Sequence, residues 1–219
     1  MRIVDHRLRA AGSRFRVAQA TTPNMGAAMA PRFVVIHYTA GTTAAGAIGW
    51  MCDPASKVSA HLVIDRTNGA VTQLVPFDRI AWHAGRSIWQ GTDDLNRCAI
   101  GIELDNAGKL ERRDGGWRST AGVAIPDADV VVATHAAETE PAGWHRFTPV
   151  QLAALDAVVL ALRAAYPIEA ILGHDEIAPG RKLDPGPAFP IAALRARAAA
   201  GGPPAPPSLR DRLRALFGR

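Results

Sequence analysis

The sequence predicts one α/β (α+β) domain, with helices flanking a central mixed β-sheet. Short apolar runs of the kind found in buried strands are interleaved with helical segments along the chain. Two of these runs end in a histidine. The composition, 48% hydrophobic and 21% charged in 219 residues, is sufficient for a full hydrophobic core. A chain of this length is expected to form a single domain with at most a short appendage.

The strands are predicted from compact apolar runs. Residues 33–37, "FVVIH", form a buried run that carries a histidine at its carboxyl end. Residues 59–76 contain two β-rich runs on either side of "TNG", which predicts a hairpin. In residues 98–105, "CAIGIELD", alternation directs the large apolar side chains to one face and Glu103 to the other. Residues 168–174, "IEAILGH", predict a further strand that again ends in a histidine.

Three helices are predicted. Residues 42–54 are rich in small and apolar residues and stop at a proline. Residues 148–167 give the clearest pattern, with Thr148 as N-cap, a proline in the first turn and Gln151 at the capping-box position. Residues 191–200 predict a shorter helix.

The remaining segments define the expected domain organisation. Residues 107–143 are polar and loop-like apart from an apolar patch at 130–132, which indicates a long insertion at the sheet edge, lining a cleft. We expect a single domain over residues 1–200, with its core at 30–195. Residues 201–219 combine a Pro-rich linker with a short basic tail, whose amphipathic pattern suits weak association with an anionic surface.

Composition also excludes several classes of protein. The net charge of +5 is modest and spread along the chain, and no nucleic-acid-binding motif is present, so no nucleic-acid partner is expected. No apolar run is long enough for a transmembrane segment. The arginine-rich N-terminus lacks the apolar segment of a secretory signal, which predicts a cytoplasmic protein. Cys52 and Cys98 form no CxxC pair and are interpreted as isolated thiols.

A candidate metal site follows from the two histidines at strand ends. If those strands are neighbours, His37 and His174 meet at one rim of the sheet, and Asp184 lies nearby on a loop stiffened by prolines. Two imidazoles, one carboxylate and an open position are the ligand set of a hydrolytic zinc enzyme. Two satisfied core histidines and a turn-capping aspartate would produce the same pattern, and the sequence does not distinguish zinc from another divalent ion.

Two further residues could supply catalytic groups. Glu103 lies within an apolar strand, where a carboxylate is costly without a partner, and beside a metal-bound water it would act as a general base. Lys182, two residues before Asp184, could stabilise the oxyanion formed when water attacks an amide. A salt bridge for Glu103 and a solvated loop position for Lys182 are the alternatives.

Five motifs occur in order along the chain: "VVIHYTAG", "SAHLVIDRTNGAVTQLVP", "IAWHAGRS", "AIGIELDNAG" and "GHDEIAPGRKLDPGPAFP". Together they resemble the zinc-dependent N-acetylmuramoyl-L-alanine amidases of the AmpD and AmiD type, relatives of the T7-lysozyme-like amidases and the peptidoglycan recognition proteins. The resemblance implies a central mixed sheet with zinc in a groove. It also implies cleavage of the amide between N-acetylmuramic acid, or its 1,6-anhydro form, and L-alanine in peptidoglycan or muropeptides.

The resemblance places functional roles on particular residues. It implies that His37, His174 and Asp184 bind zinc, and that Glu103 and Lys182 are catalytic. Some relatives have a catalytic tyrosine where this chain has Ala60, so Glu103 is expected to act as the sole base. Other relatives use a cysteine as the third ligand, where this chain has Asp184. The "HYTA" form looks more like AmiD than AmpD, which leaves open the preference for anhydro or reducing muramyl ends.

The remaining histidines are assigned roles around the site. We expect Tyr38, Trp82 and His83 to line the substrate groove, with His61 contacting substrate or hydrogen-bonding close to the metal. His135 and His145, in or beside the insertion, are predicted to lie at the surface.

Two alternative functions remain compatible with the same motifs. One is a peptidoglycan-binding or sensing module without catalysis, and the other is a phage-type endolysin that applies the same chemistry to intact wall. The complete set of ligands and catalytic residues favours an enzyme. The oligomeric state is not predicted.

Overall fold

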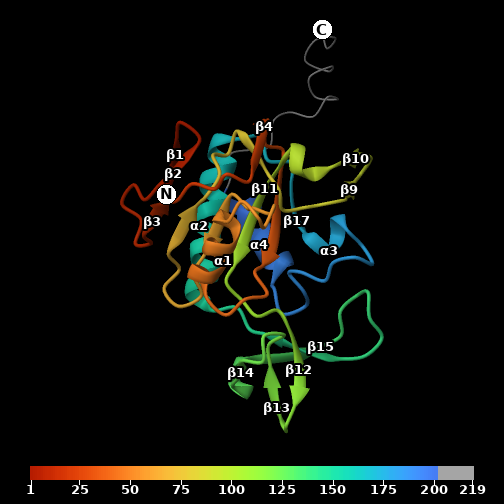
Figure 1. Ribbon diagram of the computed structural model, residues 1–219. Coiled ribbons are helices and arrows are strands. Elements are labelled where there is room, and N and C mark those ends of the chain that lie inside the picture. The colour runs from red at the N-terminus through yellow and green to blue at the C-terminus, as the bar shows by residue number, and fades with distance from the viewer. Residues whose placement is uncertain (202–219) are drawn as a thin grey trace.

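The computed structural model describes residues 1–201, and the predicted linker and basic tail at 202–219 lie outside the described residues. Within the described part, the main sheet has six strands in the order β17-β5-β11-β6-β7-β3 (Figure 1). β17, β5, β11 and β6 run parallel, whereas β7 is antiparallel to β6. The predicted mixed sheet is therefore confirmed. The strands are β3 (Val17–Gln19), β5 (Phe33–Tyr38), β6 (Leu62–Ile64), β7 (Val71–Gln73), β11 (Ala99–Leu104) and β17 (Ala170–Gly173).

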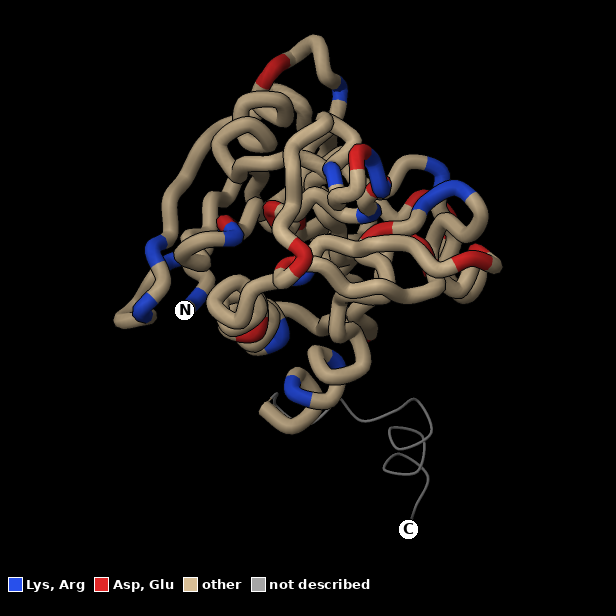
Figure 2. The backbone as a smooth tube through the Cα atoms, turned by 90° about the horizontal axis from the view of Figure 1, so that it is seen from below, with Lys and Arg blue, Asp and Glu red and all other residues tan. Residues whose placement is uncertain are grey.

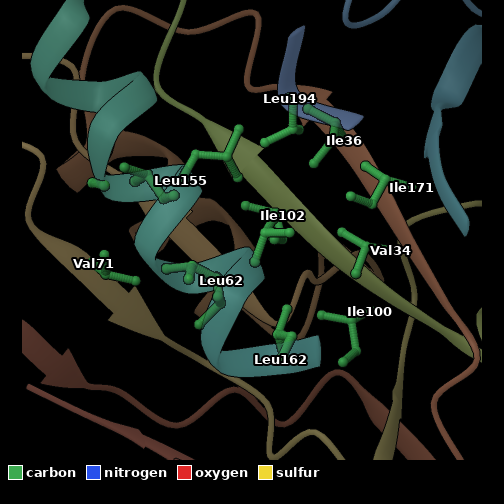
Figure 3. Close-up of a cluster of buried hydrophobic side chains, with 14 of the residues drawn as sticks. Val34, Ile36, Leu62, Val71, Ile100, Ile102, Leu155, Leu162, Ile171 and Leu194 are labelled. Carbon is green, nitrogen blue, oxygen red and sulfur yellow. The ribbon is translucent and has the colours of Figure 1, made fainter. Parts of the chain in front are cut away.

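Helices cover both faces of this sheet. On one face, α2 (Pro149–Ala165) and α4 (Ile191–Gly201) bury the main hydrophobic cluster, where Leu155 and Leu162 meet Ile102 and its strand neighbours (Figure 3). On the other face, α1 (Ala44–Cys52) and the short α3 (His174–Ile177) pack against smaller apolar clusters. The predicted alternation along β11 is confirmed, because its large apolar side chains all face α2.

Of the two hydrogen bonds in the predicted capping box of α2, only the one accepted by Thr148 is formed. The Oγ1 atom of Thr148 accepts a hydrogen bond from the Gln151 amide at 3.3 Å. The Gln151 side chain does not return to the cap. It is fully buried and donates to the carbonyls of Ile64 at 2.9 Å and Asp105 at 3.1 Å. The predicted reciprocal capping box is wrong, because satisfying two buried strand-end carbonyls takes precedence over a cap.

The segment predicted as a loop-like insertion is a second sheet. Its strands are β12 (Lys109–Arg113), β13 (Gly116–Arg118), β14 (Ala124–Ile125), β15 (Val130–Ala133) and β16 (Ala142–His145), in the order β14-β13-β12-β16-β15. All of its pairings are antiparallel, and it forms a lobe beyond the end of the main sheet (Figure 1). The overlooked sequence signal is "DGG": Asp114 and Gly115 both have positive φ at the β12–β13 turn.

Small elements complete the described chain. β1 (Arg2–Val4) pairs with β2 (Arg7–Arg9), β4 (Met25–Ala28) with β8 (Arg79–Ala81), and β9 (Ile88–Trp89) with β10 (Thr92–Asp93); two 3-10 turns cover Leu95–Arg97 and Asp127–Asp129. Basic and acidic residues are interspersed over the chain (Figure 2). Cys52 and Cys98 are free thiols, as predicted. Among residues 1–201, no helix combines the length and apolar character needed to cross a membrane.

Candidate active site

The two strand-end histidines meet at one rim of the main sheet. β5 and β17 are adjacent and parallel, with Gly173 opposite Ile36. His37 is the next residue of β5, and His174 directly follows β17. Parallel neighbours end at the same edge, so both imidazoles project from the same place, as the sequence predicts.

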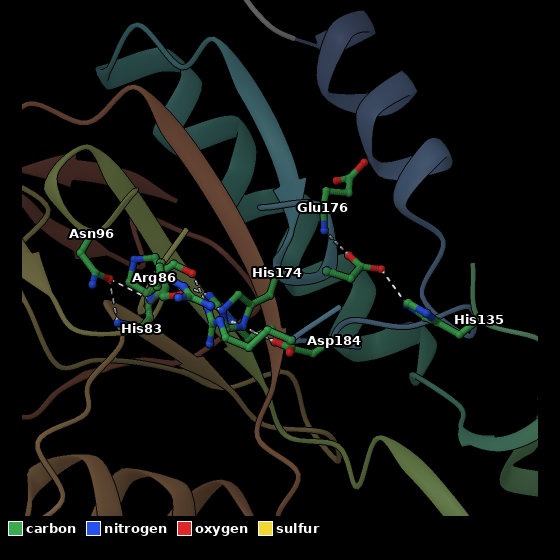
Figure 4. A network of polar contacts seen from close by, with 11 residues as sticks. His83, Arg86, Asn96, His135, His174, Glu176 and Asp184 are labelled. Atoms are coloured by element: carbon green, nitrogen blue, oxygen red, sulfur yellow. Dashed lines mark hydrogen bonds and ion pairs between the residues drawn. The ribbon is translucent and has the colours of Figure 1, made fainter. Parts of the chain in front are cut away.

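Asp184 completes a three-donor cluster. Its backbone carbonyl accepts a hydrogen bond from the Asp175 amide at 2.8 Å, which holds the loop against the start of α3. The Nδ1 atoms of His37 and His174 lie 2.9 Å apart. Oδ2 of Asp184 lies 3.0 Å from the first and 2.9 Å from the second. All three residues are buried, and Figure 4 shows His174 and Asp184 pointing at each other.

This donor cluster fits a metal ion. Nε2 of His174 lies 3.1 Å from the carbonyl oxygen of Ala84, which can only accept, so Nε2 carries a proton; when the ring has a single proton, Nδ1 is a bare lone pair. Burial and the neighbouring His174 lower the pKa of His37 to about 4, so its ring is neutral. Nδ1 of His37, Nδ1 of His174 and Oδ2 of Asp184 are therefore in mutual contact with no more than one proton among them. Three lone-pair donors arranged in this way suit a cation. Two imidazole nitrogens and a carboxylate oxygen match zinc.

Glu103 lies beside this cluster. It is directly opposite His37 in the parallel pairing of β11 with β5, so both side chains leave the same face of the sheet. Its Oε2 atom is buried and has no hydrogen-bond partner among the described residues. Burial, followed by the nearby charge of Asp184, raises the pKa of Glu103 to about 8, while Lys182 acts in the opposite direction. A carboxylate with this pKa can accept and return a proton near neutral pH.

A cleft of about 440 Å³ opens over these groups. Of the residues expected at the site, all but His61 line it. Several residues that sequence reasoning missed also contribute to the wall, notably Trp50 and Met51 of α1, Val58, Ser59 and Arg181. Trp50 is a large apolar residue left 60% exposed, which marks a binding surface. A tryptophan in a short helix made largely of small residues is the signal that could have identified this wall.

The chain and its architecture match a known family. Residues 27–187, more than half of the chain, match the family described as N-acetylmuramoyl-L-alanine amidase (Amidase_2). The protein belongs to this amidase family. The resemblance inferred from the five motifs is therefore confirmed.

Individual relatives agree with the family assignment. The chain is 35% identical over 183 residues to the N-acetylmuramoyl-L-alanine amidase AmiD of Escherichia coli, which covers 80% of this chain and 54% of AmiD. A crystal structure of a selenomethionine AmpD derivative has a TM-score of 0.61 at 29% identity, covering 90% of this chain and 99% of that one. The complex of E. coli AmiD with anhydro-N-acetylmuramic acid-L-Ala-D-γ-Glu-L-Lys has a TM-score of 0.58 at 31% identity, covering 92% and 66%. The chain spans about half the length of the curated relatives it matches.

His61 does not have the position expected of a substrate-binding residue. It is fully buried, and both ring nitrogens are bonded to main chain. Nδ1 accepts from the Gly101 amide at 3.0 Å, and Nε2 donates to the Arg79 carbonyl at 2.9 Å. The expectation of substrate contact is corrected, because no atom of His61 is free to face the cleft. His61 instead joins the hairpin to β11.

The second sheet is connected to the site through residues predicted to be exposed. His135 and His145 are only 4% and 8% exposed, so the surface prediction is wrong for both. Nε2 of His135 lies 3.0 Å from a carboxylate oxygen of Asp175, the residue after a cluster histidine. Nδ1 of His145 accepts from the Ala107 amide at 3.1 Å. The first contact attaches the second sheet to α3, and the second attaches it to the segment that follows β11.

Tyr38 connects the second sheet to β5. Its ring lies so close to Gly108, whose φ is +71°, that a Cβ atom there would be 2.3 Å from the ring. Burial raises the pKa of Tyr38 to about 12, so the phenol stays protonated at the mouth of the cleft. The ring therefore serves both as a structural link and as part of the cleft wall.

Proposed function

We propose that this protein is a zinc-dependent amidase that hydrolyses the bond between N-acetylmuramic acid, or its 1,6-anhydro form, and L-alanine in peptidoglycan fragments. The observation that carries the proposal is the convergence of three metal-donor atoms beside Glu103, whose buried Oε2 atom has no hydrogen-bond partner within residues 1–201, in a cleft open to solvent. His37, His174 and Asp184 would hold the ion. Zinc bound there would polarise the scissile carbonyl and lower the pKa of a water molecule.

Glu103 supplies the proton transfers in this proposal. Among the residues that the structure describes, its buried Oε2 atom has no hydrogen-bond partner that would compete for a proton taken from the attacking water. The raised pKa allows the same group to deliver that proton to the alanine nitrogen as the amide bond breaks. One carboxyl group therefore acts first as base and then as acid, and no covalent enzyme intermediate is required.

Lys182 contributes positive charge to the same cleft. It lines the cleft together with Glu103, and its charge is close enough to lower the pKa of that carboxylate. An ammonium in this place stabilises negative charge that develops on the amide oxygen during attack. Because the loop that carries Lys182 also carries Asp184, the ammonium is positioned together with the metal-binding carboxylate.

The cleft also suits the proposed substrate class. Tyr38, Trp82 and Trp50 give it aromatic walls, which suit the apolar faces of a sugar ring, and Arg181 adds a cation for the carboxylates of a stem peptide. AmiD is 31% identical to this chain, and its complex contains an anhydromuramyl peptide. Soluble muropeptides are the simplest substrates consistent with this support, and intact sacculi are the alternative.

A substrate panel tests the proposal. Zinc-loaded protein is incubated separately with anhydro-muramyl tripeptide, reducing-end muramyl tripeptide and intact sacculi, and free stem peptide is measured by mass spectrometry. Release from the tripeptides alone supports a muropeptide amidase, and release from sacculi as well supports a wall-lytic enzyme. No release from any of them by protein that binds zinc would contradict the proposal and favour a peptidoglycan-binding module.

A further inference from the structure

His83 makes an unusual pair of contacts behind the donor cluster. Its Nδ1 atom lies 3.0 Å from Nε2 of His37, the ring nitrogen that faces away from the other two donors. Its Nε2 atom lies 3.1 Å from the carbonyl oxygen of Ala99. His83 was expected to contact substrate, yet both of its ring nitrogens are already engaged by protein.

The chemistry of the Ala99 carbonyl sets the direction of both hydrogen bonds. A carbonyl oxygen can only accept, so Nε2 of His83 must carry a proton and donate it. The Nδ1 atom of the neutral ring is then an acceptor, and Nε2 of His37 must be the donor to it. With its proton on Nε2, the neutral His37 ring presents a bare Nδ1 lone pair to the donor cluster.

The backbone is shaped to hold His83 in this place. A Cβ atom on Gly101 would lie 2.4 Å from the His83 ring, so the ring occupies space that only a glycine leaves free. The Oδ1 atom of Asn96 accepts from the amides of His83 at 3.0 Å and Ala84 at 2.8 Å (Figure 4). The turn fixed in this way also carries the Ala84 carbonyl, which accepts a hydrogen bond from Nε2 of His174.

We propose that His83 is a positioning residue that fixes the tautomer and ring orientation of His37, so that its Nδ1 atom is presented to the metal. The inference rests on the proposed metal site. Two adjacent residues of one turn then orient both histidine ligands, His83 through its side chain and Ala84 through its carbonyl. Partners of this kind behind a metal ligand typically account for about 10- to 100-fold in metal affinity.

Two amide substitutions separate positioning from packing. In His83→Asn, the side-chain oxygen can stand where Nδ1 stands and still accept from His37. In His83→Gln, the amide reaches the position of Nε2, keeps the bond to Ala99 and leaves His37 without its acceptor. Circular dichroism and chemical unfolding of the metal-free proteins establish that both variants are folded.

Zinc affinity, measured by competition with a chromophoric chelator, is the first readout. We expect His83→Gln to weaken binding about 10- to 100-fold and His83→Asn to recover most of that loss. Equal affinities for the wild type and His83→Gln would overturn the proposal. Failure of the wild type to bind zinc would instead contradict the proposed function, so the two failures are distinguishable.

The tautomer itself is the second readout, and it requires no variant. Imidazole ¹⁵N shifts of the metal-free wild-type protein should show His37 protonated on Nε2 and bare on Nδ1. His83→Gln should show a mixture of tautomers, and His83→Asn should resemble the wild type. A wild-type His37 protonated on Nδ1 would overturn the proposal even if neither variant folds.

Discussion

Glu103 and His37 lie opposite each other on the parallel strands β11 and β5 and project from the same face of the sheet. Glu103 carries the carboxylate whose buried Oε2 atom has no hydrogen-bond partner in the described part of the chain, and His37 carries a nitrogen that could bind a metal. This register places the proposed general base next to the proposed metal site without any loop between them. Two buried strands thus determine the relative positions of the proposed base and metal.

Replacing Glu103 with glutamine should abolish most turnover and leave zinc binding intact. The amide keeps the size of the side chain but cannot take a proton from water, and general acid–base catalysis typically contributes about 10²- to 10⁴-fold. Glu111→Gln, at an exposed position of β12, is the matched control. Turnover on a muramyl tripeptide and zinc content are measured together. A Glu103→Gln rate equal to that of the wild type would remove Glu103 from the mechanism.

Replacing Asp184 with asparagine should weaken zinc binding more severely than any change at His83. The substitution removes a negatively charged metal ligand, whereas a change at His83 removes only a residue that hydrogen-bonds to a ligand. Loss of such a hydrogen-bonding residue lowers metal affinity by up to about 100-fold, and the loss in Asp184→Asn should be larger. Asp93→Asn, at an exposed position of β10, serves as the control. Chelator competition gives the affinities. Unchanged affinity in Asp184→Asn would show that the ion binds elsewhere.

Gly101→Ala should disturb the proposed metal site indirectly, by displacing His83. The added Cβ would lie 2.4 Å from the His83 ring, so the ring must leave the position in which it contacts His37. Overpacking of this kind costs about 1–3 kcal/mol of unfolding free energy, and we expect weaker zinc binding with it. Gly116→Ala in β13 is the control, because no neighbouring atom lies within 4 Å of the place that its Cβ atom would take. Urea unfolding and chelator competition check both effects, and wild-type behaviour of Gly101→Ala would contradict the tight contact.

The stability of the metal-free protein should fall as the pH is lowered from about 6.5 towards 4, partly through His145. Burial, with a smaller effect of Arg66, lowers the pKa of His145 to about 4 from an ordinary value of 6.5. The unfolded chain therefore binds a proton in this window that the folded chain does not. The contribution is complete above about pH 6.5 and is lost as the pH falls.

Urea unfolding at pH 7 and pH 5 measures this effect. His145→Asn keeps an acceptor for the Ala107 amide but cannot titrate, so its stability should depend less on pH. The difference between the two pH dependences should be on the order of 1–2 kcal/mol. Identical pH dependences for the variant and the wild type would contradict a neutral, buried His145.

Much of the main sheet and of the candidate site could be predicted because the determinants are local. β5, β11 and β17 are compact apolar runs, and α2 begins at a capping threonine followed by proline. Histidines at the ends of β5 and β17 indicated a shared rim because parallel strands end at one edge. The charge and position of Glu103 within an apolar strand indicated a functional carboxylate.

What the sequence did not reveal depends on contacts between distant segments. The second sheet has short strands, and β12 pairs with β16 across a long intervening segment, so no local periodicity indicates the sheet as a whole. His135 is buried by contact with Asp175, 40 positions away. The partner of His37 is 46 positions away, and nothing near His83 in the sequence indicates that pairing.

The most direct test of the central claim is the cleavage of anhydro-muramyl tripeptide by metal-free and zinc-reloaded protein, followed by mass spectrometry. The account predicts that reloaded wild-type protein releases the tripeptide with a free L-alanine amine. It also predicts that the metal-free protein and zinc-loaded Glu103→Gln release almost none. Equal release by the metal-free and reloaded proteins would contradict a metal-dependent amidase built on His37, His174 and Asp184.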